Sequence, residues 1–182
     1  MTLVFEDIQQ KYFDEVIDIC NSQFGFEYFK MHWLEAFVKE KDTCFVKVVL
    51  DENEQVLGFC LNQIIKQNEI VDYLKLSSFS EFDEFFGGFN QIGVLKTICV
   101  KPGLTKFGIG TQLIQRSMDE FQKRNVNKIA SVAWKSANGI NIDKSLRKFG
   151  LSPIVEVPNF WSGLSCGVCG DNCICSAVIY LS

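Results

Sequence analysis

The chain has 182 residues, a net charge of −4, an apolar content of 47% and eight cysteines. This length indicates one compact domain over residues 1–182, which can bury about 70% of the surface of its unfolded chain without covalent cross-links. The acidic balance and the lack of a Lys/Arg-rich run exclude a typical nucleic-acid-binding protein. No apolar run approaches the roughly 18 residues of a transmembrane helix, and the first residues do not resemble a signal peptide, so we expect a cytoplasmic protein without a membrane partner.

The amino-terminal part of the chain predicts both strands and helices. Alternating apolar residues indicate a strand, and apolar residues at steps of three and four indicate a helix. The run DENEQ between two β-rich segments is typical of a hairpin turn. In chain order we expect a strand, two helices and two strands at 2–8, 10–20, 28–40, 44–50 and 56–65.

Residues 67–92 leave two interpretations open. Phe79, Phe82, Phe86 and Phe89 fall near helical spacing, and acidic residues lie among them. The segment is either an amphipathic cover for the core or an aromatic wall beside an acceptor pocket, with carboxylates that favour an amine. The first interpretation is preferred, because aromatic residues at helical spacing usually belong to the core.

The second half of the chain predicts strands and helices in alternation. The apolar run VLKTICV forms a strand, the helix after it carries one apolar stripe, and Gly150 ends the next helix. The expected elements are a strand, a helix, a strand, a helix and two strands at 94–100, 108–124, 128–134, 141–149, 154–160 and 176–181.

The strand-to-helix turn near residues 98–111 has the chemistry of a pyrophosphate site. The first amides of a helix lack intrahelical partners and lie at the positive end of its dipole. Gly108 and Gly110 remove the side chains that would keep phosphates away from those amides, and Lys101 and Lys106 add positive charge. The alternative is a tight connection with glycines for steric reasons. The turn lacks the third glycine of the dinucleotide fingerprint and the lysine of a P-loop.

The run TICVKPGLTKFGIGTQLIQRSMDEF resembles motif A of the GNAT superfamily of N-acetyltransferases. That motif has a Gln or basic residue, two variable residues, Gly, a variable residue, and Gly or Ala. The corresponding positions here are Thr105, Lys106, Phe107, Gly108, Ile109 and Gly110. The later run SLRKFGL resembles the last helix of the family and its Gly-Phe ending, so the specific resemblance covers about residues 93–151.

The resemblance implies an α/β fold, with a mixed, strongly twisted sheet of about six or seven strands and helices on both faces. The strands at 94–100 and 128–134 would splay apart, and acetyl-CoA would lie between them as the co-substrate of direct acetyl transfer to an amine of a small molecule or a protein. The implied cofactor-binding residues are Ile98, Cys99, Val100, Thr105, Lys106, Phe107, Gly108, Ile109, Gly110, Thr111 and Asn138.

Two positions depart from the family pattern. Thr105 stands where the family prefers Gln or Arg, which weakens a side-chain contribution to phosphate binding. Leu146 stands where the family often has a tyrosine general acid, so the thiolate is protonated in another way or the chain has lost the chemistry. The only histidine, His32, is interpreted as an ordinary surface or packed residue. The catalytic residues stay unknown, and the alternative function is a non-catalytic GNAT-fold module that senses acyl-CoA or binds a protein.

The eight cysteines fall into two groups. Four are scattered through apolar segments and are interpreted as small buried hydrophobic residues: Cys20, Cys44, Cys60 and Cys99. The other four lie in the run SCGVCGDNCICSAVIY. Cys166 and Cys169 have C-x-x-C spacing with a glycine after each, and Cys173 and Cys175 would face the same side of an extended chain.

Four soft ligands so close in sequence predict one structural Zn²⁺ site in a reducing compartment. Such an ion would clamp the last two strands together. An iron–sulfur centre, free thiols in a Gly-rich hairpin and local redox pairing are the alternatives. A zinc-knuckle interaction protein is a weaker interpretation, because the cluster is short and lies between predicted strands.

Overall fold

The computed structural model describes residues 2–25, 28–76, 82–104, 107–135 and 139–182, without the side chains of residues 82 and 83. Within these residues, seven strands form a single sheet. The strands are β1 Val4–Asp7, β2 Cys44–Leu50, β3 Val56–Lys66, β4 Gln91–Val100, β5 Ile129–Lys135, β6 Ser152–Val157 and β7 Ser176–Leu181. The α-helices are α1 Phe13–Phe24, α2 Met31–Lys39, α3 Gln67–Tyr73, α4 Phe82–Phe86, α5 Ile109–Lys123 and α6 Asp143–Lys148.

The sheet has the strand order β1-β2-β3-β4-β5-β7-β6. Only the β4–β5 pair is parallel, and the other pairs are antiparallel. The last strand, β7, lies between β5 and β6 rather than at the edge. The predicted α/β fold with a mixed sheet of six or seven strands is confirmed.

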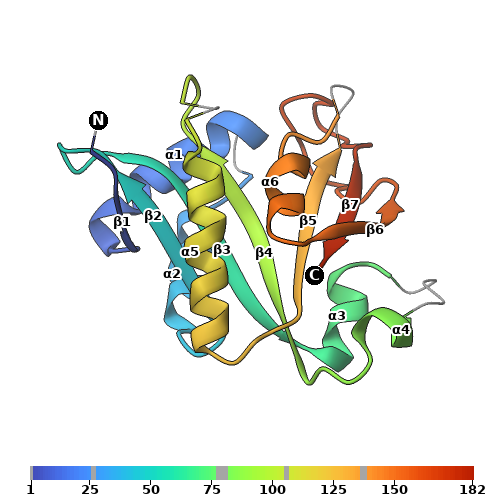
Figure 1. Cartoon of the computed structure of the whole chain (residues 1–182). Helices are drawn as coiled ribbons and strands as arrows, with labels where there is room; N and C mark the ends of the chain where they lie inside the picture. Colours follow the sequence, from blue (N-terminus) through green and yellow to red (C-terminus); the bar gives the residue numbers. More distant parts are fainter. Residues whose placement is uncertain (1, 26–27, 77–81, 105–106, 136–138) are drawn as a thin grey trace.

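Helices cover both faces of this sheet (Figure 1). On one face, α5 and α6 bury an apolar cluster that includes Leu113, Phe121 and Leu146. On the opposite face, α1 and α2 bury a second cluster that includes Val16 and Leu34. None of the helices in the described part of the chain has both the length and the apolar character needed to cross a bilayer.

The segment 67–92 folds as two short helices before β4. Ile70 and Leu74 belong to a third apolar cluster, together with Phe86, which is completely buried. Phe89 is exposed, and Phe79 lies outside the described residues. The burial of Phe86 agrees with the preferred interpretation, an amphipathic cover for the core.

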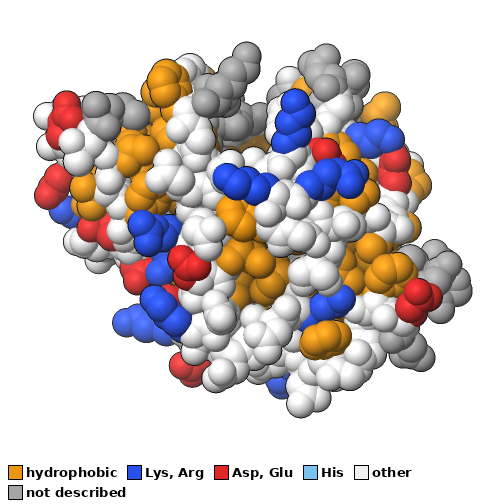
Figure 2. Space-filling model, viewed as in Figure 1, with side chains coloured by type: hydrophobic (Ala, Val, Ile, Leu, Met, Phe, Trp, Pro, Cys, Tyr) orange, Lys and Arg blue, Asp and Glu red, His pale blue; other side chains and the backbone are white. Residues whose placement is uncertain are grey.

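The parallel strands β4 and β5 pair only at their beginnings. Their register joins Gly93 to Ile129 and ends at Leu95 opposite Ser131. At that point the pairing of β4 with β3 shifts, which leaves Lys96 as an extra residue in β4. Because a bulge bends a strand and increases its twist, the carboxyl ends of β4 and β5 diverge toward the top of the view (Figure 1). The upper edge of the molecule is indented between the parts that carry α5 and α6 (Figure 2).

Candidate active site

An open cleft of about 770 Å³ lies where β4 and β5 diverge. Strand β4 lines it with residues Leu95 to Ile98, and strand β5 lines it with residues Ser131 to Trp134. The rest of the lining comes from the end of α1, the residues before α6 and one distant tryptophan: Gln23, Phe24, Tyr28, Asn141, Ile142 and Trp161.

The register of β4 against β3 decides which backbone groups of β4 face the cleft. The Lys101 N–H donates to Leu57 O at 2.8 Å. Hydrogen-bonded pairs alternate along antiparallel strands, so the backbone groups of Cys99 face β3, and those of Ile98 and Val100 face the cleft. Of the three β4 residues predicted to pair with a pantetheine arm, the register therefore leaves Ile98 and Val100 in position.

Two contacts reduce what the predicted site can offer. The side-chain amide of Gln23 donates to the carbonyl oxygen of Val100, which occupies that acceptor. The Lys101 ammonium group lies 3.9 Å from the Glu15 carboxylate, so part of its charge is already balanced. The N–H groups and the remaining carbonyl of this strand edge are the groups left for a ligand.

Helix α5 begins directly after Gly108, which is left-handed with a φ of 74°. The Gly108 carbonyl accepts from the Gln112 N–H at 3.0 Å, so the hydrogen-bond ladder of the helix starts there. No described residue accepts a hydrogen bond from the amides of Ile109, Gly110 or Thr111. These three amides lie at the positive end of the helix dipole, where an anion is stabilised.

Packing against the described residues explains neither of the two glycines. Among those residues, a Cβ at Gly108 would have no atom within 4 Å, and a Cβ at Gly110 would have only Val100 Cγ2 at an ordinary 3.8 Å. By contrast, a Cβ at Gly93 would lie 2.8 Å from the ring of Phe121. Glycine at 108 is explained by its left-handed φ, whereas neither packing nor backbone conformation requires glycine at 110.

The other predicted cofactor-binding residues are placed as follows. Phe107 is 64% exposed, whereas the side chain of Ile109 is buried in the core. The hydroxyl groups of Thr111 and Ser145 lie 3.1 Å apart and link α5 to α6. Thr105, Lys106 and Asn138 lie outside the described residues.

The extra residue of β4, Lys96, is a feature that the sequence interpretation missed. Its Nζ donates to the hydroxyl of Tyr73 at 2.8 Å and lies 4.8 Å from the centre of that ring. Burial lowers the pKa of Lys96 below the usual lysine value and raises the pKa of Tyr73. A lysine in the middle of an otherwise apolar strand was the available signal, because lysine is rarely buried without a role or a partner.

Lys96 lines both the cleft and a neighbouring groove of about 1000 Å³. The groove is bordered by aromatic residues of the α1–α2 region, and Trp161 is shared with the cleft. A smaller space of about 330 Å³, called the aromatic pocket below, joins the same cleft. It is lined by Phe24, Tyr28, Trp134, Trp161, Leu164, Ser165, Cys166 and Cys173.

Leu146, which the resemblance aligns with the family's tyrosine, lies on α6. Its side chain is completely buried in the cluster beneath α5 and α6. Tyr180 comes close to this helix from β7, but its hydroxyl donates to the carboxylate of Asp143. That contact raises the pKa of Tyr180, after the larger effect of burial, to about 12.

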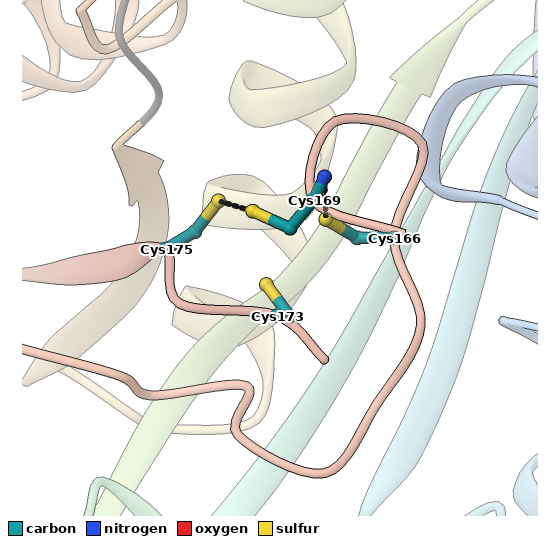
Figure 3. Close-up of side chains that lie close together, drawn as sticks. All are labelled: Cys166, Cys169, Cys173 and Cys175. Carbon is teal, nitrogen blue, oxygen red and sulfur yellow. Dashed lines mark hydrogen bonds between the residues drawn. The ribbon is translucent and has the colours of Figure 1, made fainter. Parts of the chain in front are cut away.

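The eight cysteines separate in the structure as predicted. The scattered four are buried and are not disulfide-bonded: Cys20, Cys44, Cys60 and Cys99. The sulfur atoms of Cys166, Cys169, Cys173 and Cys175 all lie within 4.8 Å of one another. In Figure 3 these four side chains converge from two turns of the segment between β6 and β7.

The turn Cys166–Gly170 has the geometry of a metal-binding knuckle. Backbone hydrogen bonds join its two ends, with Cys166 N–H to Gly170 O at 2.9 Å and Gly170 N–H to Cys166 O at 3.0 Å. The Cys169 N–H donates to Cys166 Sγ at 3.2 Å, and Cys169 Sγ lies 3.4 Å from Cys175 Sγ (Figure 3). Burial raises the pKa of Cys166, but the amides of Cys169 and Val168 outweigh it and bring the pKa to about 7. These groups fit a metal ion that binds thiolate sulfur.

Comparison with known proteins adds the following. The model of the acetyltransferase (GNAT) family matches residues 5–143, a range that ends before the cysteine cluster. No curated protein matches the chain. NAA60 of Arabidopsis thaliana in complex with acetyl-CoA is similar in structure, with a TM-score of 0.75 and 12% identity over 100% of this chain and 98% of that chain.

Two further solved structures have the same fold. Arylalkylamine N-acetyltransferase 2 of Aedes aegypti has a TM-score of 0.69 and 14% identity over 100% of this chain and 99% of its own. The ribosomal-protein-S18-alanine N-acetyltransferase of Escherichia coli has a TM-score of 0.67 and 12% identity over 99% of this chain and 92% of its own.

Proposed function

The chain belongs to the acetyltransferase (GNAT) family, and on that premise we propose that it transfers the acetyl group of acetyl-CoA directly to a primary amine of a small molecule or a protein. The observation that carries the proposal is the start of α5. Three amides without a partner among the described residues lie there beside a glycine that neither packing nor conformation requires. A ligand phosphate that approaches the backbone explains both facts.

The cofactor-binding residues divide by the part of coenzyme A that they meet. Ile98 and Val100 on the free edge of β4 pair with the pantetheine arm as a neighbouring strand does. The amides of residues 107–111 bind the pyrophosphate, to which Lys106 adds charge. Thr105 and Asn138 complete the proposed set. An N–H group of the β4 edge stabilises the negative charge that develops on the thioester oxygen during transfer.

Lys96 is proposed as the proton acceptor for the attacking amine. The amine nitrogen forms a bond to the acetyl carbon, the carbon–sulfur bond breaks, and the proton of the amine goes to neutral Lys96, from which it passes through water to the departing thiolate. The lowered pKa of Lys96 increases the fraction of neutral side chain near neutral pH. Its place between the cleft and the aromatic groove puts it where an acceptor meets the thioester.

The acceptor side is apolar, which favours an amine with an apolar or aromatic substituent. The polar groups of the aromatic pocket are the hydroxyls of Ser165 and Tyr28, the indole nitrogens and the sulfur atoms of Cys166 and Cys173. No described residue that lines it carries a carboxylate or a basic side chain. An anionic substituent would therefore lose its hydration there without gaining a charged partner.

We also propose that Cys166, Cys169, Cys173 and Cys175 hold a structural Zn²⁺. Four thiolates with no open position are the ligand set of structural rather than catalytic zinc. Tetrahedral Zn–S bonds of about 2.3 Å place sulfur atoms about 3.8 Å apart, which is close to the observed spread of up to 4.8 Å. The proposal places the protein in the cytoplasm, where thiols stay reduced.

Gly110→Asp tests the cofactor site without removing the fold. An acidic residue in the first helical turn stabilises α5 through the helix dipole, but it repels the phosphates from the same amides. We expect an unchanged or higher melting temperature and a loss of coenzyme A affinity of about 100-fold, since two unit charges about 6 Å apart repel by roughly 2.8 kcal/mol at an effective dielectric of 20. Calorimetric titration with coenzyme A measures the loss of affinity.

Gly110→Ala is the matched control, because its methyl group fits beside Val100 and carries no charge. Its affinity for coenzyme A should stay within about threefold of the parent. Tight binding by Gly110→Asp would contradict the proposal.

A non-catalytic acyl-CoA-binding module remains the second candidate, favoured by the buried Leu146 in place of a tyrosine. Release of free thiol from acetyl-CoA in the presence of a panel of primary amines separates the two. Release that depends on an amine supports the enzyme. Binding of acetyl-CoA without release by any amine would support the module instead.

A further inference from the structure

The segment between β6 and β7, residues 158–175, borders the aromatic pocket without a core of its own. It supplies Trp161, Leu164 and two of the cluster cysteines to the lining. Phe160 and Trp161 pack against the third apolar cluster, whereas Leu164 is 47%, Val168 61% and Ile174 69% exposed. Beyond Trp161, burial of apolar surface therefore contributes little to the order of this segment.

Backbone contacts attach the segment at a few points only. The Gly167 N–H donates to Phe24 O at 3.0 Å, at the last residue of α1. Gly25 allows this approach, since a Cβ there would lie 3.2 Å from the Gly167 nitrogen. The Cys173 N–H donates to Leu164 O at 3.0 Å, which joins the second half of the cluster to the pocket wall.

We infer that a metal ion on the four cysteines builds one wall of the acceptor site, so that metal occupancy sets the affinity for the acceptor amine and leaves the affinity for coenzyme A unchanged. The inference rests on the proposed function for the identity of the ligands. Two metal ligands, Cys166 and Cys173, themselves line the aromatic pocket. Without the ion, only the few backbone bonds would hold the knuckle against α1, and the pocket would lose its wall.

The cofactor groups lie on other elements. The edge of β4 and the first turn of α5 contain none of the four cysteines, and no cluster cysteine lines the cleft between β4 and β5. The metal can therefore leave without removing a group that is proposed to contact coenzyme A. Loss of the metal should therefore change the affinity for the acceptor amine and leave the affinity for coenzyme A unchanged.

All three tryptophans of the chain report on this region. Trp134 and Trp161 line the aromatic pocket, and Trp33 lines the groove and the surface hollow beside the knuckle. We expect about one zinc per chain in protein purified under reducing conditions, measured by elemental analysis. A chelator should remove it and shift tryptophan emission to longer wavelength, and added Zn²⁺ should restore the emission.

The binding assay uses phenethylamine as the acceptor probe and coenzyme A as the second ligand. Removal of zinc should weaken the binding of phenethylamine about tenfold, which equals about 1.4 kcal/mol. It should change the affinity for coenzyme A less than twofold. Because binding is measured directly, the result stands even where no acetyl transfer is found. The metal site would be overturned if the purified protein contained no zinc and a chelator left its tryptophan emission unchanged. Equal affinity of both forms for phenethylamine, or binding to neither, would overturn its role in the acceptor site.

A matched pair of variants separates loss of metal from loss of a buried thiol. Cys173→Ala removes one ligand, whereas Cys44→Ala removes a thiol that is also buried but lies on β2 outside the cluster. Only Cys173→Ala should lose zinc and weaken phenethylamine binding. Coenzyme A affinity reports that each variant is folded, and equal zinc content in the two variants would contradict the assigned ligands.

Discussion

The two ends of the proposed acetyl transfer are built in different ways. The cofactor side consists of backbone groups on regular elements, the edge of β4 and the first turn of α5. The acceptor side consists of aromatic side chains from α1, the following residues, β5 and the segment between β6 and β7. A backbone site needs only the correct strand, turn and helix, whereas a side-chain site needs residues that are far apart in the sequence to meet.

This difference explains why the proposed acceptor side would need a cross-link. The cofactor side is held by the ladders of β3 and α5 and by the core beneath them. Residues 158–175 have no ladder beyond one isolated bridge between Cys166 and Gly170. The proposed metal ion would supply on the acceptor side the stability that hydrogen bonds and packing supply on the cofactor side.

The largest expected effect is on the cofactor side. Gly108→Asp places a carboxylate at the helix start, and coenzyme A affinity should fall at least about 100-fold through charge repulsion. Gly108→Asn is the control of equal size, because Asn accepts the left-handed conformation and carries no charge. The φ of 74° makes both variants slightly less stable. If titration finds equal affinities for the two variants, charge at the helix start plays no part in binding.

The next effect tests the point where the two sides meet. Lys96→Met should lower kcat by about 100-fold, within the usual range for loss of a general base. Because the proposed base acts in its neutral form, activity of the parent should rise as the pH passes upward through the lowered pKa of Lys96. This rise should be absent in the variant.

Lys128→Met provides the control for Lys96. Burial also lowers the pKa of Lys128, but this residue lies directly before β5, and its Nζ donates to Ser182 O at 2.6 Å. Its pH profile should match that of the parent. If the activity of Lys96→Met still rose with pH as in the parent, another group would be the proton acceptor.

The sequence predicted the cofactor side better than the acceptor side, for a physical reason. Strand and helix periods are local, so β2, β3, β5 and β7 fell within about two residues of their predicted bounds. Strand β4 begins at Gln91 rather than at the predicted residue 94, because Gln91 pairs with Lys66 at the far end of β3. The four metal-binding candidates were also predictable, since their spacing is short.

Features that depend on tertiary contacts were not predictable. The insertion of β7 between β5 and β6 has no local signature. Alternation along VLKTICV gives no sign of the bulge at Lys96, which only the register with β3 reveals. The aromatic pocket brings Phe24 and Tyr28 close to Trp161, which lies more than a hundred positions later in the sequence. Those contacts are set by packing of the whole fold rather than by a repeat or a motif.

The smallest effect comes from one substitution made on each side. Gly110→Ala introduces a methyl group into a helical conformation, so the free energy of unfolding should rise by about 0.5–1 kcal/mol. Gly170→Ala makes the same change at a φ of 78°, where L residues are strained, so it should cost about 1 kcal/mol. Neither methyl group meets a close neighbour, which leaves backbone conformation as the main difference.

The strain at Gly170 should appear in metal affinity rather than in coenzyme A affinity. Competition with a zinc-binding dye should show about fivefold weaker zinc binding by Gly170→Ala, which corresponds to about 1 kcal/mol. Gly110→Ala should leave zinc binding unchanged and raise the melting temperature. Equal shifts in zinc affinity for the two variants would mean that the knuckle and the cofactor turn are coupled. The separation between the backbone-built and metal-built sides would then be wrong, even if each ligand still bound where it is proposed.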